Sequence, residues 1–91
     1  MFDNPGCGWC ARWKREVGAV YGKTDEGRIL PLRAIVGRTP PPGDFSLERP
    51  IVVTPTFVVV EGGRERTRIV GYPGESAFWQ LLGDAIRELR P

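Results

Sequence analysis

The chain has 91 residues, with 13 Lys and Arg against 11 Asp and Glu, so its formal net charge is +2. This balance is too mild to indicate a nucleic-acid surface, and the length leaves room for only one domain. The longest apolar runs, Ile51–Val53 and Phe57–Val60, fall far short of the roughly 20 residues of a membrane helix. We therefore expect a single domain over residues 1–91, with no nucleic-acid partner and no membrane span.

The chain contains no histidine and only two cysteines, Cys7 and Cys10. The absence of His excludes Ser-His-Asp and Cys-His catalytic sites and a His-ligated catalytic metal. Small secreted domains held by disulfides usually have four or more cysteines spread along the chain. Two cysteines this close together therefore serve a local role and do not form a framework for the whole domain. We expect a redox pair; the alternatives are a structural disulfide, or half of a zinc site completed by a second copy. No metal is expected, because the chain lacks the other two ligands.

The first part of the chain predicts a short strand, an amphipathic helix and a second strand. Residues 1–3 leave room for only a short strand, which we expect to be cut short at the N-terminus; residues 1–6 contain no signal-peptide pattern. Apolar residues at steps of three and four predict a helix over 7–21, ended by Gly22. Residues 23–27 are expected to form a polar loop, and Leu32–Val36 a strand.

Proline and glycine divide the next part into segments. Three successive prolines at 40–42 exclude regular structure over residues 37–44. The β-branched and aromatic run Phe57–Val60 predicts a strand that is buried on both faces. Gly62-Gly63 predicts a tight hairpin, and residues 67–70 the returning strand.

Two further patterns lie in the last third of the chain. Arg64, Arg66 and Arg68 alternate along the returning segment, and we interpret them as one solvated face in preference to an anion site. Helical spacing of apolar residues, including Phe78, predicts a final helix from Glu75 to Leu89.

The two cysteines open the first predicted helix. A cysteine at a helix N-terminus faces unpaired backbone N–H groups and the positive end of the helix dipole, which stabilise its thiolate. Cys7 takes this place and is the candidate nucleophile, and Cys10, one turn later, is the candidate resolving cysteine. Trp9 between them is either an exposed contact for partners or a partly buried surface residue, whereas Trp13 is expected in the core.

Thr54-Pro55 is the second candidate part of the site. A cis proline that leads directly into a buried strand can present a backbone edge beside a dithiol. An extended polypeptide substrate could pair with such an edge through main-chain hydrogen bonds. Thr54, Pro55 and Trp9 are therefore the candidate substrate-binding residues.

The order of these elements resembles that of a small thioredoxin-fold protein over nearly the whole chain. The resemblance rests on residues 2–10 leading into the helix, on residues 53–57, and on the Gly62-Gly63 hairpin with the final helix. It implies a compact α/β domain with a central mixed sheet of about four strands and flanking helices. The implied activity is thiol-disulfide exchange through a redox-active Cys7–Cys10 disulfide, with no other cofactor.

Three shorter blocks carry a narrower resemblance. Residues 4–13, 54–58 and 71–75 resemble the periplasmic thioredoxins that are encoded with bacterial sulfur-oxidation (Sox) genes. This resemblance implies a periplasmic protein that keeps partner proteins of thiosulfate oxidation reduced and is itself reduced by a membrane electron-donor thiol protein. We also expect a monomer.

The chain departs from the general thioredoxin pattern in two places. That pattern has a buried acid six residues before the first cysteine, where this chain has Met1, and the role of that acid does not transfer to Asp3. The proline-rich stretch between Val36 and Thr54 predicts that the middle helix is short or missing. Two other functions stay open: an oxidant or isomerase of secreted disulfides, which differs in redox potential, and a redox-inactive peptide-binding module.

Overall fold

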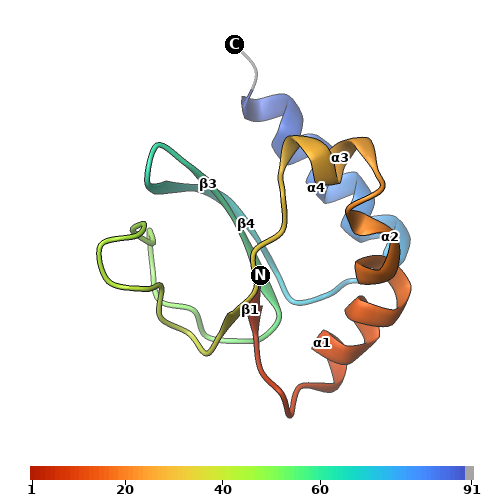
Figure 1. The fold of residues 1–91 in the computed structure, drawn as a ribbon, viewed down its shortest axis with the longest axis horizontal. Helices are drawn as coiled ribbons and strands as arrows, with labels where there is room; N and C mark the ends of the chain where they lie inside the picture. Colours follow the sequence, from red (N-terminus) through yellow and green to blue (C-terminus); the bar gives the residue numbers. More distant parts are fainter. Residues whose placement is uncertain (90–91) are drawn as a thin grey trace.

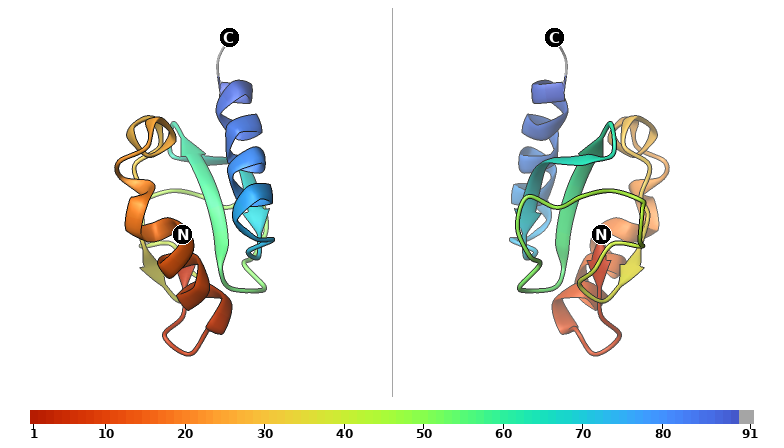
Figure 2. Two further views of the ribbon diagram at one scale, coloured as in Figure 1. Left: turned by 90° about the vertical axis from the view of Figure 1, so that its right-hand side faces the viewer. Right: turned by 90° about the vertical axis from the view of Figure 1, so that its left-hand side faces the viewer.

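The computed structural model describes residues 1–89. The elements in chain order are β1 (Phe2–Asp3), α1 (Gly8–Trp13), η1 (Lys14–Gly18), α2 (Ala19–Tyr21), α3 (Asp25–Ile29), β2 (Ile35–Val36), β3 (Thr56–Glu61), β4 (Arg64–Val70) and α4 (Glu75–Leu89). All the helices cover one face of the sheet, and the long segment between β2 and β3 crosses the other face (Figure 1; Figure 2). No helix among the described residues is long and apolar enough to cross a membrane.

The sheet has four strands in the order β2-β1-β3-β4. β1 runs parallel to β2 and antiparallel to β3, and β3 and β4 form an antiparallel hairpin. Gly62 and Gly63 turn this hairpin with φ values of 63° and 77°, a backbone region that glycine enters without steric cost. The predicted mixed sheet of about four strands is confirmed.

The segment predicted as one helix over 7–21 is helical from Gly8 onward and contains one wider turn. α1 continues into η1, a π-helical turn in which the Ala19 amide donates to the Lys14 carbonyl five residues back. Gly18 lies against the ring of Trp13, since a Cβ at this position would lie 3.1 Å from a ring carbon. The small residue therefore leaves room for the buried indole.

The prediction of a loop over residues 23–27 is wrong for residues 25–27. Residues 25–29 form α3, and the hydroxyl of Thr24 caps the helix by accepting a hydrogen bond from the Gly27 amide at 3.0 Å. A threonine followed by two acidic residues is a helix-start pattern. The helix α3 itself is too short to be identified from the periodicity of its apolar residues.

Replacement of Gly27 by Ala is expected to lower the free energy of unfolding by about 3 kcal/mol. A Cβ at Gly27 would lie 1.9 Å from the carbonyl oxygen of Tyr21, so backbone must move to admit it. The control is Gly83→Ala in α4, where the nearest atom is the end of a flexible side chain at 3.7 Å. That change is expected to stabilise the fold by about 0.5–1 kcal/mol. Urea denaturation followed by circular dichroism measures both, and equal effects would contradict the packing argument.

Two predicted strands differ from the observed ones. The strand predicted over Leu32–Val36 is limited to Ile35–Val36, because its partner β1 is only two residues long. β3 is not buried on both faces: Val60 at its end is 37% exposed. The segment across the outer face of the sheet leaves this end of β3 uncovered.

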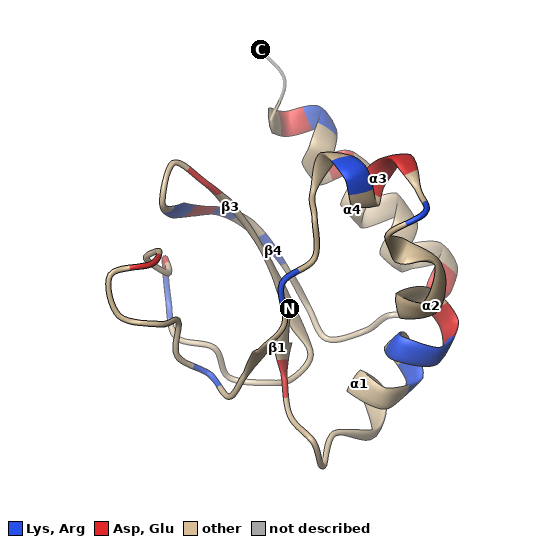
Figure 3. Cartoon of the chain, in the orientation of Figure 1, with Lys and Arg blue, Asp and Glu red and all other residues tan. Residues whose placement is uncertain are grey.

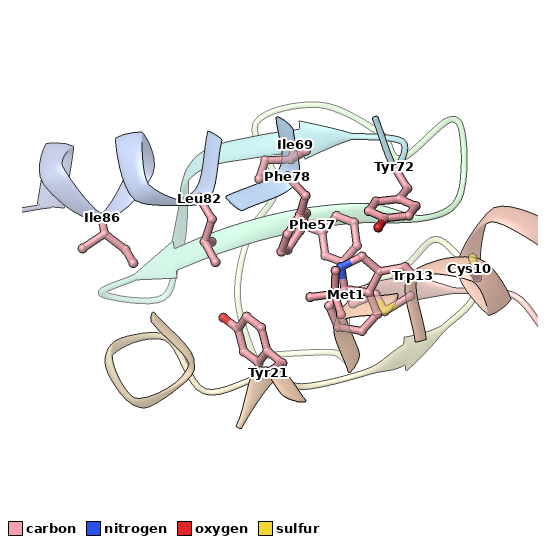
Figure 4. Packing of buried hydrophobic residues seen from close by; sticks show 11 residues of the cluster. Met1, Cys10, Trp13, Tyr21, Phe57, Ile69, Tyr72, Phe78, Leu82 and Ile86 are labelled. Atoms are coloured by element: carbon pink, nitrogen blue, oxygen red, sulfur yellow. The ribbon is translucent and has the colours of Figure 1, made fainter. Parts of the chain in front are cut away.

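The core lies between the helices and the sheet. It contains Met1, Cys10, Trp13, Val17, Tyr21, Phe57, Ile69, Tyr72, Phe78, Leu82 and Ile86. At its centre the rings of Trp13, Phe57 and Phe78 lie 4.9–5.7 Å apart between centroids (Figure 4). The predicted core position of Trp13 is confirmed, Phe78 packs against it, and Cys10 lies at the end of this aromatic cluster (Figure 4).

Residues 37–55 form no helix, as the prolines predicted. A buried ion pair on β4 holds part of this segment against the sheet. Arg68 donates to both carboxylate oxygens of Glu65, and to the carbonyl oxygens of Arg49 at 2.7 Å and Pro50 at 3.2 Å. Glu65 in turn accepts a hydrogen bond from the Glu48 amide at 2.8 Å. This pair therefore ties the segment that leads to Thr54 to β4.

The interpretation of three arginines on one solvated face is wrong for Arg68. Arg64 and Arg66 are exposed, but the side chain of Arg68 is buried. The strand pairing shifts register between Val59 and Val60. Such a bulge inserts one extra residue and breaks the alternation of faces on which the interpretation rested.

Candidate active site

Cys7 is the N-cap residue of α1, where the sequence analysis placed it. Its backbone is extended, and its sulfur accepts a hydrogen bond from the amide of Cys10 at 3.1 Å. The Cys7 amide donates to the Asn4 carbonyl, which fixes the turn before the helix. The first free N–H groups of α1 therefore point at the Cys7 sulfur, and a negative charge there is stabilised by them.

The pKa of Cys7 lies below its ordinary value. Partial burial acts to raise the pKa, but hydrogen bonds from the Cys10 thiol, the Thr54 side chain and the amides of Cys10 and Trp9 outweigh burial. When protonated, the thiol donates to the Thr54 carbonyl oxygen at 3.2 Å. Cys7 is half-buried, so its sulfur combines a stabilised thiolate with access from solvent.

Cys10 has the opposite character. It is only 1% exposed, and burial raises its pKa to about 11, with a further upward contribution from its hydrogen bond to Cys7. Both cysteines are free thiols in this structure. The dithiol is therefore asymmetric, with an accessible, more acidic sulfur beside a buried, less acidic one.

Thr54 and Pro55 lie directly beside the dithiol. The peptide bond between them is cis, and the Thr54 carbonyl is the group that contacts the Cys7 sulfur. The Gly71 amide donates to the Pro55 carbonyl at 2.8 Å, which ties this segment to the end of β4. The predicted cis proline and its nearness to Cys7 are confirmed.

Trp9 projects from the turn between the cysteines. Its side chain is 56% exposed, which favours the exposed alternative for this residue. The guanidinium of Arg12 lies over the indole, 5.5 Å from the ring centroid, a geometry that gives a cation-π attraction.

Asp3 is a site residue to which the sequence analysis assigned no role. It is buried at the end of β1, pairs with Lys14 at 2.6 Å, and accepts a hydrogen bond from the Asn4 amide. Burial acts to raise the pKa of Asp3, but the hydrogen bonds from Lys14, Cys10 and Asn4 lower it overall. The sequence does contain a signal for this pairing, because Asp3 adjoins Phe2 in a strand that must be buried. An unpaired charge in such a strand would be costly, so Asp3 needs a partner.

Asp3→Asn is expected to lower the pKa of Cys10. Burial is the main cause of the high pKa of Cys10, and the hydrogen bond to the Asp3 carboxylate adds to it by favouring the thiol. Absorbance of the thiolate during a pH titration measures this in a Cys7→Ser background, so that a single thiol titrates. An unchanged or higher pKa would show that Asp3 does not act on Cys10.

A known protein family matches nearly the whole chain. The family model described as a thioredoxin-like domain matches residues 1–86. The chain belongs to this thioredoxin-like family. A search among curated protein sequences finds no match.

A solved thioredoxin has the same fold. The crystal structure of the periplasmic thioredoxin SoxS from Paracoccus pantotrophus, in its reduced form, matches with a TM-score of 0.92 and 44% sequence identity. The match covers 99% of this chain and 95% of that chain. This thioredoxin-like protein is therefore a thiol-disulfide oxidoreductase with a thioredoxin fold. Among residues 1–89, no group of three or more Cys, Asp or Glu side chains is arranged to hold a metal ion.

Proposed function

We propose that this thioredoxin-like protein reduces disulfide bonds of partner proteins in the periplasm, within a sulfur-oxidation pathway. The observation that carries the proposal is the asymmetric dithiol, with Cys7 at the helix N-terminus and Cys10 buried behind it. The 44% identity to a periplasmic SoxS thioredoxin supports the compartment and the pathway. A membrane thiol protein that returns the dithiol to its reduced form belongs to the same proposal.

The reaction consists of two exchange steps. The Cys7 thiolate attacks one sulfur of the partner disulfide, forms a mixed disulfide and releases the other partner sulfur as a thiolate, which takes a proton from water. Cys10 then loses its proton and attacks the Cys7 sulfur, so that the second partner sulfur leaves and is protonated. The partner gains two electrons and two protons, and Cys7 and Cys10 become a disulfide.

The high pKa of Cys10 explains why it reacts only after Cys7 has formed the mixed disulfide. A buried thiol with a pKa of about 11 stays protonated while the mixed disulfide forms, so it does not compete with Cys7 for the partner. Once Cys7 is in a disulfide, Cys10 is the nearest nucleophile, because the two residues lie one helical turn apart. The ion pair between Asp3 and Lys14 is the charged group next to Cys10.

Thr54 and Pro55 form the proposed docking edge for the partner. The Thr54 amide has no hydrogen-bond partner among residues 1–89 and can donate to an extended substrate strand next to the Cys7 sulfur. Pairing of this kind recognises the main chain, so it accepts partners of different sequence. Trp9, which is exposed and lies between the two cysteines in the sequence, is the proposed side-chain contact.

Insulin reduction tests the proposal. The wild-type protein with dithiothreitol is expected to precipitate insulin chains faster than dithiothreitol alone. The redox potential of the Cys7–Cys10 pair then separates a reductant from an oxidant: a value near about −270 mV supports reduction, and one near about −120 mV indicates an oxidant or isomerase. Failure to reduce insulin would favour a redox-inactive peptide-binding module.

A further inference from the structure

A chain of polar contacts begins at Tyr72, directly after β4. The Tyr72 hydroxyl donates to Glu16 Oε1 at 2.6 Å, which joins the loop before α4 to the π-helical turn. Arg12 donates through Nε to the other oxygen of Glu16 at 3.1 Å. The same guanidinium covers the Trp9 ring. These contacts connect a buried tyrosine to the exposed indole beside the nucleophile.

The other end of this chain of contacts reaches the docking edge. Tyr72 follows Gly71, whose amide donates to the Pro55 carbonyl. Tyr72 itself is buried and packs on Phe78, with 6.2 Å between ring centroids, so its backbone is anchored in the core. Figure 4 shows Tyr72 at the same end of the core as Trp13 and Cys10. The contacts therefore run from the segment that is bonded to Pro55 to the indole of Trp9, which lies between the two cysteines in the sequence.

The protonation states of Glu16 and Tyr72 favour the hydrogen bond between them. Hydrogen bonds from Tyr72 and Arg12 hold the pKa of Glu16 below its ordinary value, and burial with the contact to Glu16 raises the pKa of Tyr72 to about 12. Glu16 is therefore an anion and Tyr72 a donor at neutral pH. Figure 3 shows basic positions and then an acidic position along the helical segment that begins with α1.

We propose that the contacts Tyr72–Glu16–Arg12 form a brace that positions the Trp9 indole as a preformed docking surface for protein disulfides. Glu16 is the central positioning residue, because one carboxylate oxygen serves each of the other two members. The proposal rests on the proposed function, in which partner proteins dock beside Cys7. A side chain held in place before binding loses less conformational freedom when the partner arrives. A disulfide too small to reach Trp9 gains nothing from the brace.

The test compares Glu16→Gln and Tyr72→Phe with wild type on two substrates. With insulin, both variants are expected to raise KM about three- to tenfold with little change in kcat, because a mobile Trp9 must be ordered on binding. With hydroxyethyl disulfide, a small reagent, their rates are expected to stay within twofold of wild type. The matched control is Asp84→Asn, which removes an exposed helical ion pair on α4 and is expected to change neither substrate.

Two further readouts distinguish positioning from general loosening. Acrylamide quenching of the exposed Trp9 fluorescence is expected to increase in Glu16→Gln and Tyr72→Phe, with Trp9→Phe as the reference for the two other tryptophans. In a Trp9→Ala background, Glu16→Gln is expected to raise the insulin KM no further, because the brace acts through Trp9.

Each outcome decides between the two proposals. A wild-type protein that reduces hydroxyethyl disulfide but not insulin contradicts the proposed function and the brace with it. A wild-type protein that reduces both, with an unchanged insulin KM in Glu16→Gln, overturns the brace alone. A KM effect that persists in the Trp9→Ala background also overturns it, because Glu16 would then act elsewhere.

Discussion

Replacement of Cys7 by Ser is expected to abolish disulfide exchange, whereas replacement of Cys10 by Ser leaves a protein that attacks once and stays bound to its partner. Cys7 is the accessible sulfur with the lowered pKa, so its loss removes the nucleophile. Cys10 is buried behind it and is needed only to release the mixed disulfide. Insulin reduction is expected to fall to the dithiothreitol background in both variants.

Non-reducing gel electrophoresis and peptide mass spectrometry separate the two variants. Cys10→Ser is expected to accumulate a covalent complex with insulin through Cys7, and Cys7→Ser is expected to form none. Urea denaturation of each variant controls for folding. A stable complex formed through Cys10 in Cys7→Ser would reverse the assigned roles.

Arg68→Met is expected to lower the free energy of unfolding by about 3–5 kcal/mol, because it leaves the Glu65 carboxylate buried without its partner. The matched control lies two residues earlier on the same strand. Arg66→Met breaks an ion pair with Glu61 in which both side chains are about half exposed, so its expected effect is at most about 1 kcal/mol. Urea denaturation measures both.

The same variant has a consequence at the site. Arg68 holds the carbonyls of Arg49 and Pro50, which lie five and four residues before Thr54 on the chain. Loss of this support is expected to lower activity on protein disulfides, since the docking edge is no longer fixed. Equal stability of Arg68→Met and Arg66→Met would contradict the role given to the buried pair.

The local parts of the fold and site could be predicted because short-range physics determines them. Helical spacing identified the segment over 7–21 and α4, and two glycines identified the β3–β4 hairpin. The position of Cys7 followed from its place before an amphipathic run. Proline content alone accounted for the missing middle helix.

The parts that could not be predicted depend on residues distant in sequence. Asp3 meets Lys14 and Cys10 only after β1 enters the sheet. The burial of Arg68 results from a bulge and from a loop that folds back over β4. A charged side chain in a sequence is expected at the surface, and only the tertiary structure reveals which ones have buried partners.

The most direct test of the account is the pH dependence of alkylation at each cysteine of the reduced protein. Iodoacetamide labelling, with peptide mass spectrometry to assign the site, gives the thiolate fraction of each sulfur. Because the pKa of Cys7 is lowered and that of Cys10 is raised to about 11, Cys7 is expected to be labelled first, with a midpoint below the pKa of a free cysteine. Faster labelling of Cys10, or a Cys7 midpoint at or above that value, would contradict the assignment of Cys7 as the nucleophile.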